Sequence, residues 1–449
     1  TCIKSTACQI CKYGAFMLDD LCYLKCPRPY VEDYSTWTCV LRDYSTTTTA
    51  VNSISNLIAN LGMVIRVGMI LAQLQGSAGG ALIGSSFGTE MMQYFRYINN
   101  TWPINVLQFF NGTIDSPVDL AIPYTVPQLT SLYYSQDAAQ AIIIDGGTFE
   151  YYTTSPYIMD NTLSALLTLV TLLLVVALVY SVAKYIKFKN KKVSWFVNAM
   201  DVFIGWNYFN TTALTLTIQF MVYGILNAIY PYFNTPLAIV NFIIAISALI
   251  AITTITIILT RYLVDLFELG EKQREKLSQL NPRLKGLYHE YKTGSVLQQL
   301  FLPISIVRAA IFSALITLLE VSPLIQSGAI LLNNLVYFWY LVRYTPIKKR
   351  CEMIVFGFFE LLLIGMSVCA FALAIMYITD NQDADMRTDI GWAFIVFALL
   401  MIFSDCFLAM IYILPLLYRL SLYLYKKLIY WIKKCCRKER VVPLKVPVP

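Results

Sequence analysis

The stretch TLSALLTLVTLLLVVALVYSVAKYIKFKNKK, from Thr162 to Lys192, decides the fold of this chain. Its Leu- and Val-rich part, as far as Ile186, can cross a bilayer, because about 20 apolar residues in a helix span the roughly 30 Å hydrocarbon layer. Six more such runs follow, at Ala213 to Phe233, Leu237 to Phe267, Leu297 to Leu319, Ile325 to Tyr344, Ile354 to Ile378 and Ile390 to Leu417. The sequence therefore predicts an all-α polytopic membrane protein with a bundle of seven helices.

The composition agrees with this prediction. Hydrophobic residues make up 57% of the 449 residues, charged residues only 14%, and the mean hydropathy is +0.60. Water-soluble domains of this length are less apolar. We therefore expect the lipid bilayer to be the main partner of this chain.

The positive charges predict the orientation of the helices. The basic segment Lys187 to Lys192 ends the first run and marks the cytoplasmic side of the membrane. The loops after the third and fifth runs and the C-terminal tail fall on this same side if each run crosses once, and all three are rich in Lys and Arg. We expect an extracellular or lumenal N-terminus and a cytoplasmic C-terminus, in the plasma or ciliary membrane. The net charge of +7 is then an orientation signal, and no nucleic acid is expected as a partner.

Six cysteines crowd into the N-terminus, namely Cys2, Cys8, Cys11, Cys22, Cys26 and Cys39. A segment this short cannot bury a useful core, and disulfides replace the core in oxidising compartments, so we predict a disulfide-rich extracellular module. The CxxC spacing of Cys8 and Cys11 leaves zinc binding as the alternative, and the connectivity is open. Because the chain starts at Thr1 without Met or a signal peptide, we also expect an ectodomain upstream of it.

The segment 43–161 begins and ends on the same side of the membrane, so its apolar part must return or never cross. Ser53 to Gly84 is apolar enough to enter a bilayer and carries Arg66 near its middle, which we expect to be paired or to snorkel. One interpretation is a re-entrant helical hairpin whose polar second leg, Ser85 to Tyr97, packs against protein. The other is a helix that lies on the outer leaflet or against the bundle.

The remaining part of this segment is predicted to be a mixed extracellular cap. From Pro117 to Pro156 the chain is rich in Tyr, Thr, Ile and Pro, which is typical of short strands. The sequons at Asn99 and Asn111 predict glycosylation on the outer side. The predicted domains are therefore a cysteine-rich module at 1–42, a hairpin or membrane-associated helices at 43–100, the cap at 101–161, the bundle at 162–418 and a basic tail at 419–449.

The ionisable residues Arg308, Glu360 and Asp405 fall inside the predicted helices, and Glu320 lies at the outer end of the fourth. Charges are costly in lipid, so they usually face the interior of a bundle. Glu360 and Asp405 either line a cation path or pair with the arginine, and the pair is the simpler interpretation. The cation path and the ion pair are compatible if the pair stabilises one state of a gate. Other polar residues in the runs are expected to form hydrogen bonds between helices, namely Gln219, Asn241, Asn333, Asn334 and Ser404.

The tail from Tyr418 to Pro443 combines Leu, Tyr and Trp with a dense run of Lys and Arg. This pattern predicts an amphipathic helix on the anionic cytoplasmic leaflet. Cys435 and Cys436 are candidate palmitoylation sites beside it. The alternative is a stop-transfer flank with reduced thiols, which alone would explain the charge.

The block MMQYFRYINNTWPINVLQFF, Met91 to Phe110, resembles a block of the TRP-like transmembrane family of fungi and protists, which includes flavin-carrier and polycystin-related proteins. Many protist relatives place it behind cysteine-rich repeats, and the N-terminal module here looks furin-like or EGF-like. The resemblance implies a TRP-like bundle and a cation channel or transporter, and a channel would assemble as a homo-oligomer. The matching residues are Tyr94, Phe95, Tyr97, Ile98, Asn99, Trp102 and Pro103.

Enzymatic activity is not expected. His289 is the only histidine, so no catalytic histidine dyad and no multi-histidine metal site can form, and the chain has no GxSxG motif or nucleotide-binding loop. No cofactor is expected. The alternatives to a channel or transporter are a membrane anchor of a large extracellular or cell-surface assembly and a seven-helix cell-surface receptor. The chain has no Asp-Arg-Tyr-type triplet after the third run and no NPxxY motif in the seventh, which disfavours the receptor.

Overall fold

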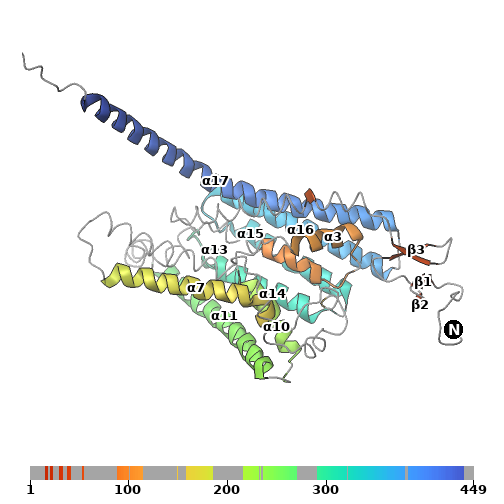
Figure 1. Ribbon diagram of the computed structural model, residues 1–449. Coiled ribbons are helices and arrows are strands. Elements are labelled where there is room, and N and C mark those ends of the chain that lie inside the picture. The colour runs from red at the N-terminus through yellow and green to blue at the C-terminus, as the bar shows by residue number, and fades with distance from the viewer. Residues whose placement is uncertain are drawn as a thin grey trace, which may run out of the picture.

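The computed structural model describes the backbone of residues 16–18, 21–23, 30–33, 38–41, 53–54, 88–100, 102–114, 149, 158–185, 216–231, 233, 236–269, 291–320, 322–379 and 383–438. The side chains at 16–41, 111–114 and 431–438, and several in 158–185 and 409–420, lie outside the described part. The helices of the described residues form one bundle, and four short strands lie near the N-terminus (Figure 1).

The N-terminal strands form a four-stranded sheet in the order β2-β1-β4-β3. They are β1 (Phe16–Leu18), β2 (Leu21–Tyr23), β3 (Tyr30–Asp33) and β4 (Thr38–Leu41). Two hairpins, β1 with β2 and β3 with β4, join through a parallel contact between β1 and β4. Cys22 and Cys39 lie on β2 and β4, whereas the bonds of all six cysteines lie outside the described part, so the disulfides stay a prediction.

Helices occupy all seven predicted ranges. They are α7 (Ile158–Tyr185), α10 (Thr217–Ile229), α11 (Pro236–Glu268), α14 (Phe301–Leu318), α15 (Pro323–Tyr344), α16 (Arg350–Ile378) and α17 (Ala384–Lys438).

Five of these helices are long and apolar enough to cross a membrane. The spanning stretches are Ala238–Glu268 in α11, the whole of α14, α15 and α16, and Ala384–Leu408 in α17. The apolar stretches described in α7 and α10 are shorter, at Leu173–Val182 and Thr217–Ile229. The chain is therefore a helical membrane protein with five helices of spanning length among its described residues, and the count of seven spans stays a prediction.

The fourth predicted run is interrupted near its start. A short helix, α13 (Val296–Gln299), ends at Leu300, and α14 begins at Phe301. Pro303 lies in the first turn of α14, where a residue without an N–H is tolerated. In a helix that ran on from Val296 the same proline would remove an internal hydrogen bond. The spanning helix therefore begins at Phe301, and not at Leu297 as predicted.

α17 joins the seventh run and the tail, which the sequence analysis separates at residue 419. It is 55 residues long, or about 80 Å at 1.5 Å per residue. Its buried side chains, among those described, end at Leu408, and the side chains from 421 to 430 are almost all exposed. Figure 1 shows this helix, in blue, lying along the bundle and then leaving it in a different direction. We call the part from Pro415 to Lys438 the α17 arm.

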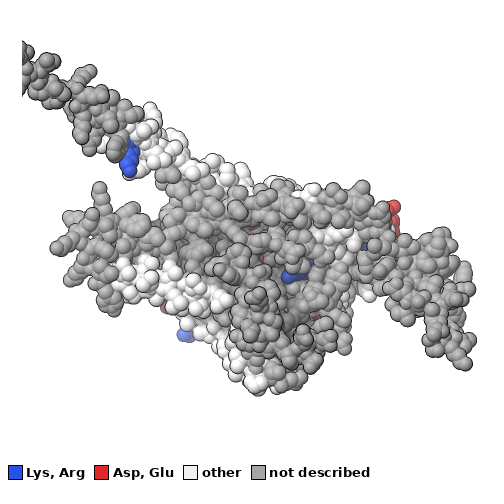
Figure 2. Space-filling model, viewed as in Figure 1, with Lys and Arg blue, Asp and Glu red and all other residues white. Residues whose placement is uncertain are grey.

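The helices α15 and α16 run in opposite directions. Gly328 of α15 faces Phe371 of α16, and Asn334 of α15 hydrogen-bonds to Ser367 of α16, so higher numbers in one helix meet lower numbers in the other. α16 packs along α17 in turn, and α10 packs against α11 and α14. The outward faces are apolar, as Ile258 of α11 shows with 61% of its surface exposed. Figure 2 shows very little charge on the described surface, as expected for helices in contact with lipid.

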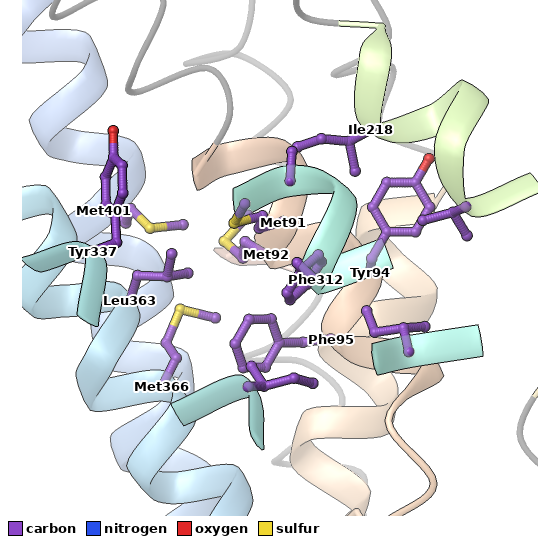
Figure 3. Close-up of a cluster of buried hydrophobic side chains, with 14 of the residues drawn as sticks. Met91, Met92, Tyr94, Phe95, Ile218, Phe312, Tyr337, Leu363, Met366 and Met401 are labelled. Atoms are coloured by element: carbon purple, nitrogen blue, oxygen red, sulfur yellow. The ribbon is translucent and has the colours of Figure 1, made fainter. Parts of the chain in front are cut away.

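A stretch that precedes the bundle in sequence lies in the middle of it. We call residues 88–114 the central segment; it contains a helical stretch at 88–94, a 3₁₀ turn, η1 (Phe95–Tyr97), and a helix, α3 (Ile104–Ile114). The ring of Phe95 lies 6.0 Å from that of Phe312 in α14 and 5.9 Å from that of Phe394 in α17. Figure 3 shows the side chains of the central segment between α10, α14, α16 and α17. The block that carries the family resemblance is thus part of the core.

Candidate functional site

Arg308 and Glu360 form an ion pair inside the bundle. Arg308 comes from α14 and Glu360 from α16, and their side chains are 4% and 0% exposed. Nη1 of Arg308 donates a hydrogen bond to Oε1 of Glu360 at 2.7 Å, and Nη2 lies 2.7 Å from Oε2. Both carboxylate oxygens therefore lie 2.7 Å from the same guanidinium, and Oε1 accepts the hydrogen bond of the pair.

A third helix holds the ion pair from the side. Asn334 of α15 accepts a hydrogen bond from Nη2 of Arg308 at 2.9 Å and donates one to Ser367 of α16 at 2.8 Å. Asn333 donates a long hydrogen bond of 3.4 Å to the Arg308 carbonyl. One arginine thus connects α14, α15 and α16, so a movement of any of these helices changes the environment of its charge.

An aromatic ring covers the guanidinium. The Arg308 Cζ lies 4.1 Å from the centre of the Tyr337 ring, within the range of a cation–π contact. The Tyr337 hydroxyl is fixed in turn by Ser305, at 2.8 Å. The arginine charge is therefore shared between a carboxylate, an amide oxygen and a π face. In this arrangement Glu360 is neutralised by Arg308, so it can act as a cation ligand only after the two side chains separate.

Asp405 of α17, the other carboxylate that was predicted to lie inside the bundle, is contacted by the central segment. Thr89 donates a hydrogen bond of 2.5 Å from Oγ1 to Oδ2 of Asp405. The neighbouring Gly88 lies directly against the ring of Phe359, which precedes Glu360 in α16. The start of the central segment therefore touches the helices that carry Glu360 and Asp405.

The contacts between the central segment and α17 extend far along that helix. Beyond the contact of Thr89, Asn105 donates a hydrogen bond of 3.1 Å to the carbonyl of Thr388. Thr388 and Asp405 are 17 residues apart in one helix, or about 25 Å, compared with about 30 Å for the hydrocarbon layer. Gly391 permits the close approach, because a Cβ there would lie 2.5 Å from Oδ1 of Asn105.

The middle of the central segment, near the α14–α15 loop, is fixed by amide side chains. Asn99 donates from its backbone to Oε1 of Gln326 at 2.8 Å and from its side chain to the Glu320 carbonyl at 2.6 Å. Asn100 donates to the carbonyl of Ala370 at 2.7 Å. The Asn99 amide nitrogen, to which a glycan would be attached, is thus already engaged. Glycosylation of Asn99 stays a prediction, as does that of Asn111, whose side chain is outside the described part.

The polar residues that were expected to connect helices do so in four of five cases. Besides Asn333 and Asn334, Asn241 of α11 accepts a hydrogen bond from the Met159 backbone at 3.0 Å, and Gln219 of α10 donates one to the Asn161 carbonyl at 2.9 Å. Ser404 instead bonds to Leu400 of its own helix. Thr89, Gln326 and Ser367 were not singled out from the sequence; their signal was a polar side chain in an otherwise apolar stretch.

Several predicted site residues are not placed. Arg66 and His289 lie outside the described residues, as do the side chains of Cys435 and Cys436 on the last turn of α17. Among the residues that the structure describes, no group of three His, Cys, Asp or Glu side chains could hold a metal ion. Lipidation of the two cysteines stays a prediction.

No family model, curated protein or solved structure matches this chain.

Proposed function

We propose that this protein is a channel or transporter for cations, of the kind that its resemblance to the TRP-like family implies, and that the Arg308–Glu360 pair is a latch between two arrangements of its helices. The observation that carries the proposal is the complete burial of this ion pair among three helices of a membrane-spanning bundle.

A buried ion pair contributes little net stability to a protein. The desolvation of two charges offsets most of their attraction, and apolar residues of similar volume usually stabilise a protein at least as well. Ionisable residues in membrane helices are therefore functional candidates by default. A pair that bridges α14 and α16 gives the bundle one well-defined arrangement, and its separation defines a second.

The two carboxylates supply the chemistry for a cation. When Arg308 withdraws, Glu360 becomes a buried anion on α16, close to the level where Asp405 projects from α17. Carboxylate oxygens replace the water ligands of a cation and raise its local concentration. Thr89 on the central segment then adds a hydroxyl oxygen beside Asp405.

The proposal includes a topology. The chain crosses the membrane with its N-terminus outside and its C-terminus in the cytoplasm, and α7 and α10 complete a set of seven spans. The part of the central segment from 88 to 97 lies in the predicted returning leg of the hairpin, and this assignment is supported by contacts that follow α17 for about 25 Å and by the contact of Asn99 with the α14–α15 loop. A channel built from this bundle forms its pore as a homo-oligomer.

The test is cation flux through the purified protein in liposomes. Liposomes that contain the wild-type chain are loaded with K⁺ or Na⁺ and placed in a gradient of that cation, at imposed voltages. These liposomes are expected to release the cation. Glu360→Gln removes the carboxylate charge and leaves Arg308 unpaired, so both the rate of flux and its voltage dependence should change. Arg343→Gln is the matched control, since Arg343 is an exposed arginine at the end of α15.

Flux of the wild-type chain that responds to Glu360→Gln and not to Arg343→Gln supports the proposal. No flux of either cation at any gradient or voltage contradicts it and leaves the membrane anchor and the cell-surface receptor as the alternatives. Flux that is identical in the Glu360→Gln protein contradicts the latch.

A further inference from the structure

The α17 arm has two chemically different sides. Leu417, Leu424 and Leu428 recur at intervals of seven and four residues, which places them on one side of a helix. Arg419, Lys426 and Lys433 recur at intervals of seven and lie on the opposite side. The backbone of α17 is helical as far as Lys438, so the leucines form one continuous apolar face and the basic residues form a continuous face opposite it.

The apolar face is open to its surroundings. Leu424 is 54% exposed and Leu428 59% exposed, and Tyr425 beside them is 61% exposed. No described part of the bundle covers them. Figure 2 shows basic side chains on this arm, where it stands away from the rest of the molecule. An apolar face of this length in water is unfavourable, so a partner is required.

The charge of the arm selects the partner. Between Cys406 and Lys438 there is no acidic residue, and the basic residues are Arg419, Lys426, Lys427, Lys433, Lys434, Arg437 and Lys438. A second copy of the same arm would bring like charges together. An anionic lipid surface instead accepts the leucines among its acyl chains and the lysines among its phosphates and carboxylates.

We propose that the α17 arm lies on the cytoplasmic leaflet of the membrane and binds acidic phospholipids. The arm is covalently joined to a spanning helix, so this surface is always within reach. Pro415 lies between Leu408, the last described buried residue, and Arg419, the first basic one. A proline has no N–H for the Ile411 carbonyl, so the helix can bend here without loss of a hydrogen bond.

The test measures the surroundings of the apolar face in the full chain. A polarity-sensitive fluorophore is attached to Leu424→Cys, in a protein whose other accessible cysteines are serine. The protein is reconstituted into vesicles of phosphatidylcholine, with or without phosphatidylserine. With phosphatidylserine, the emission should shift to the blue and be quenched by lipids that carry a quencher near the headgroup.

Charge variants separate lipid binding from other causes. Each lysine near an anionic surface raises the bound-to-free ratio of the arm about fivefold, so Lys426→Gln with Lys427→Gln should lower this ratio about 25-fold. Lys348→Gln with Lys349→Gln removes the same charge from the α15–α16 loop and should leave the fluorescence unchanged. These readouts do not depend on transport, so they hold or fail separately from the proposed function.

Equal emission in both lipid mixtures overturns the proposal, whether the fluorophore is exposed or buried. A blue shift that depends on the protein-to-lipid ratio and not on phosphatidylserine also overturns it, because a second copy then covers the face. An equal effect of the two lysine pairs shows a response to net charge alone and contradicts a specific role of the arm.

Discussion

Arg308 and Glu360 are 52 residues apart in sequence and meet inside the bundle through two contacts of 2.7 Å, one to each carboxylate oxygen. The two helices that carry them, α14 and α16, are separated along the chain by α15, which contributes Asn334 to the same arginine. The pair therefore fixes how three consecutive spanning helices sit against one another.

This arrangement predicts an asymmetry between single and double substitutions. Glu360→Gln leaves a buried arginine without its counter-charge and should lower the free energy of unfolding by about 3–5 kcal/mol. The double variant Arg308→Met with Glu360→Met removes both charges at similar volume and should recover most of that loss. Unfolding in mixed detergent micelles, followed by tryptophan fluorescence, measures both values.

Arg343→Met is the control for this experiment, because Arg343 is exposed and should change stability by less than about 0.5 kcal/mol. A double variant that is as unstable as Glu360→Gln alone would show that the pair itself, and not charge balance, stabilises the bundle.

The contact between Thr89 and Asp405 predicts a smaller effect at a distant position. Thr89→Val keeps the shape of the side chain and removes the hydrogen bond to a carboxylate, which should lower the free energy of unfolding by about 1.5–3 kcal/mol. Thr388→Val is the matched control, since its exposed hydroxyl bonds only to Ala384 of its own helix. Equal effects of the two variants in the same unfolding assay would show that the hydrogen bond from Thr89 to Asp405 does not stabilise the bundle.

Two glycines test the close packing of the central segment against α17. In Gly391→Ala the new Cβ would meet Asn105 and Pro103 at 2.5 and 2.6 Å, so the variant should lose about 1–3 kcal/mol of stability. In Gly357→Ala nothing lies within 4 Å of the new Cβ, so the helix should gain about 0.5–1 kcal/mol. Melting temperatures that move in the same direction for both variants would contradict this packing.

The sequence predicts the helices well because a spanning run is a local property. The bounds of α11, Pro236–Glu268, differ from the predicted Leu237 to Phe267 by one residue at each end. The continuity of α17 was not predicted, because a change from apolar to basic composition marks a change of surroundings and not the end of a helix. The central segment shows the main limit: apolar periodicity does not reveal whether such a stretch packs inside a bundle or lies on its surface.

The candidate site was likewise predictable where a local property of the sequence marks its residues. Arg308 and Glu360 stand out because charges are rare in apolar runs, and pairing is the economical arrangement for them. Asn334 and Thr89 are common polar residues, so their roles depend on which helices become neighbours. That information is contained in long-range packing and not in any single stretch of the chain.

The turn between α15 and α16 contains strained backbone. Thr345 has a φ angle of 40°, in the left-handed region that is unfavourable for a β-branched residue. Its hydroxyl accepts a hydrogen bond of 2.9 Å from Nζ of Lys292, and Lys292 donates from its backbone to the Pro346 carbonyl at 2.7 Å. These contacts hold the turn against the segment before α13.

Thr345→Gly should relieve this strain and raise the free energy of unfolding by about 0.5–1 kcal/mol. Thr345→Val keeps the β-branched side chain and removes only the hydroxyl, so it should give no gain. Thermal unfolding of the two variants in detergent measures the difference. A gain of stability in Thr345→Val, or a loss of stability in Thr345→Gly, would contradict the presence of strain at Thr345.

The most direct test of the membrane topology places one cysteine on each side of α16 along the chain. Lys348→Cys lies in the exposed α15–α16 turn, and Met386→Cys lies in the exposed first turn of α17. In intact cells an impermeant maleimide should label Met386→Cys, whereas Lys348→Cys should react only after permeabilisation, as read by mass spectrometry of the two peptides. Labelling of both positions in intact cells, or of Lys348→Cys alone, would contradict the proposed crossing of α16 and the orientation of the whole bundle.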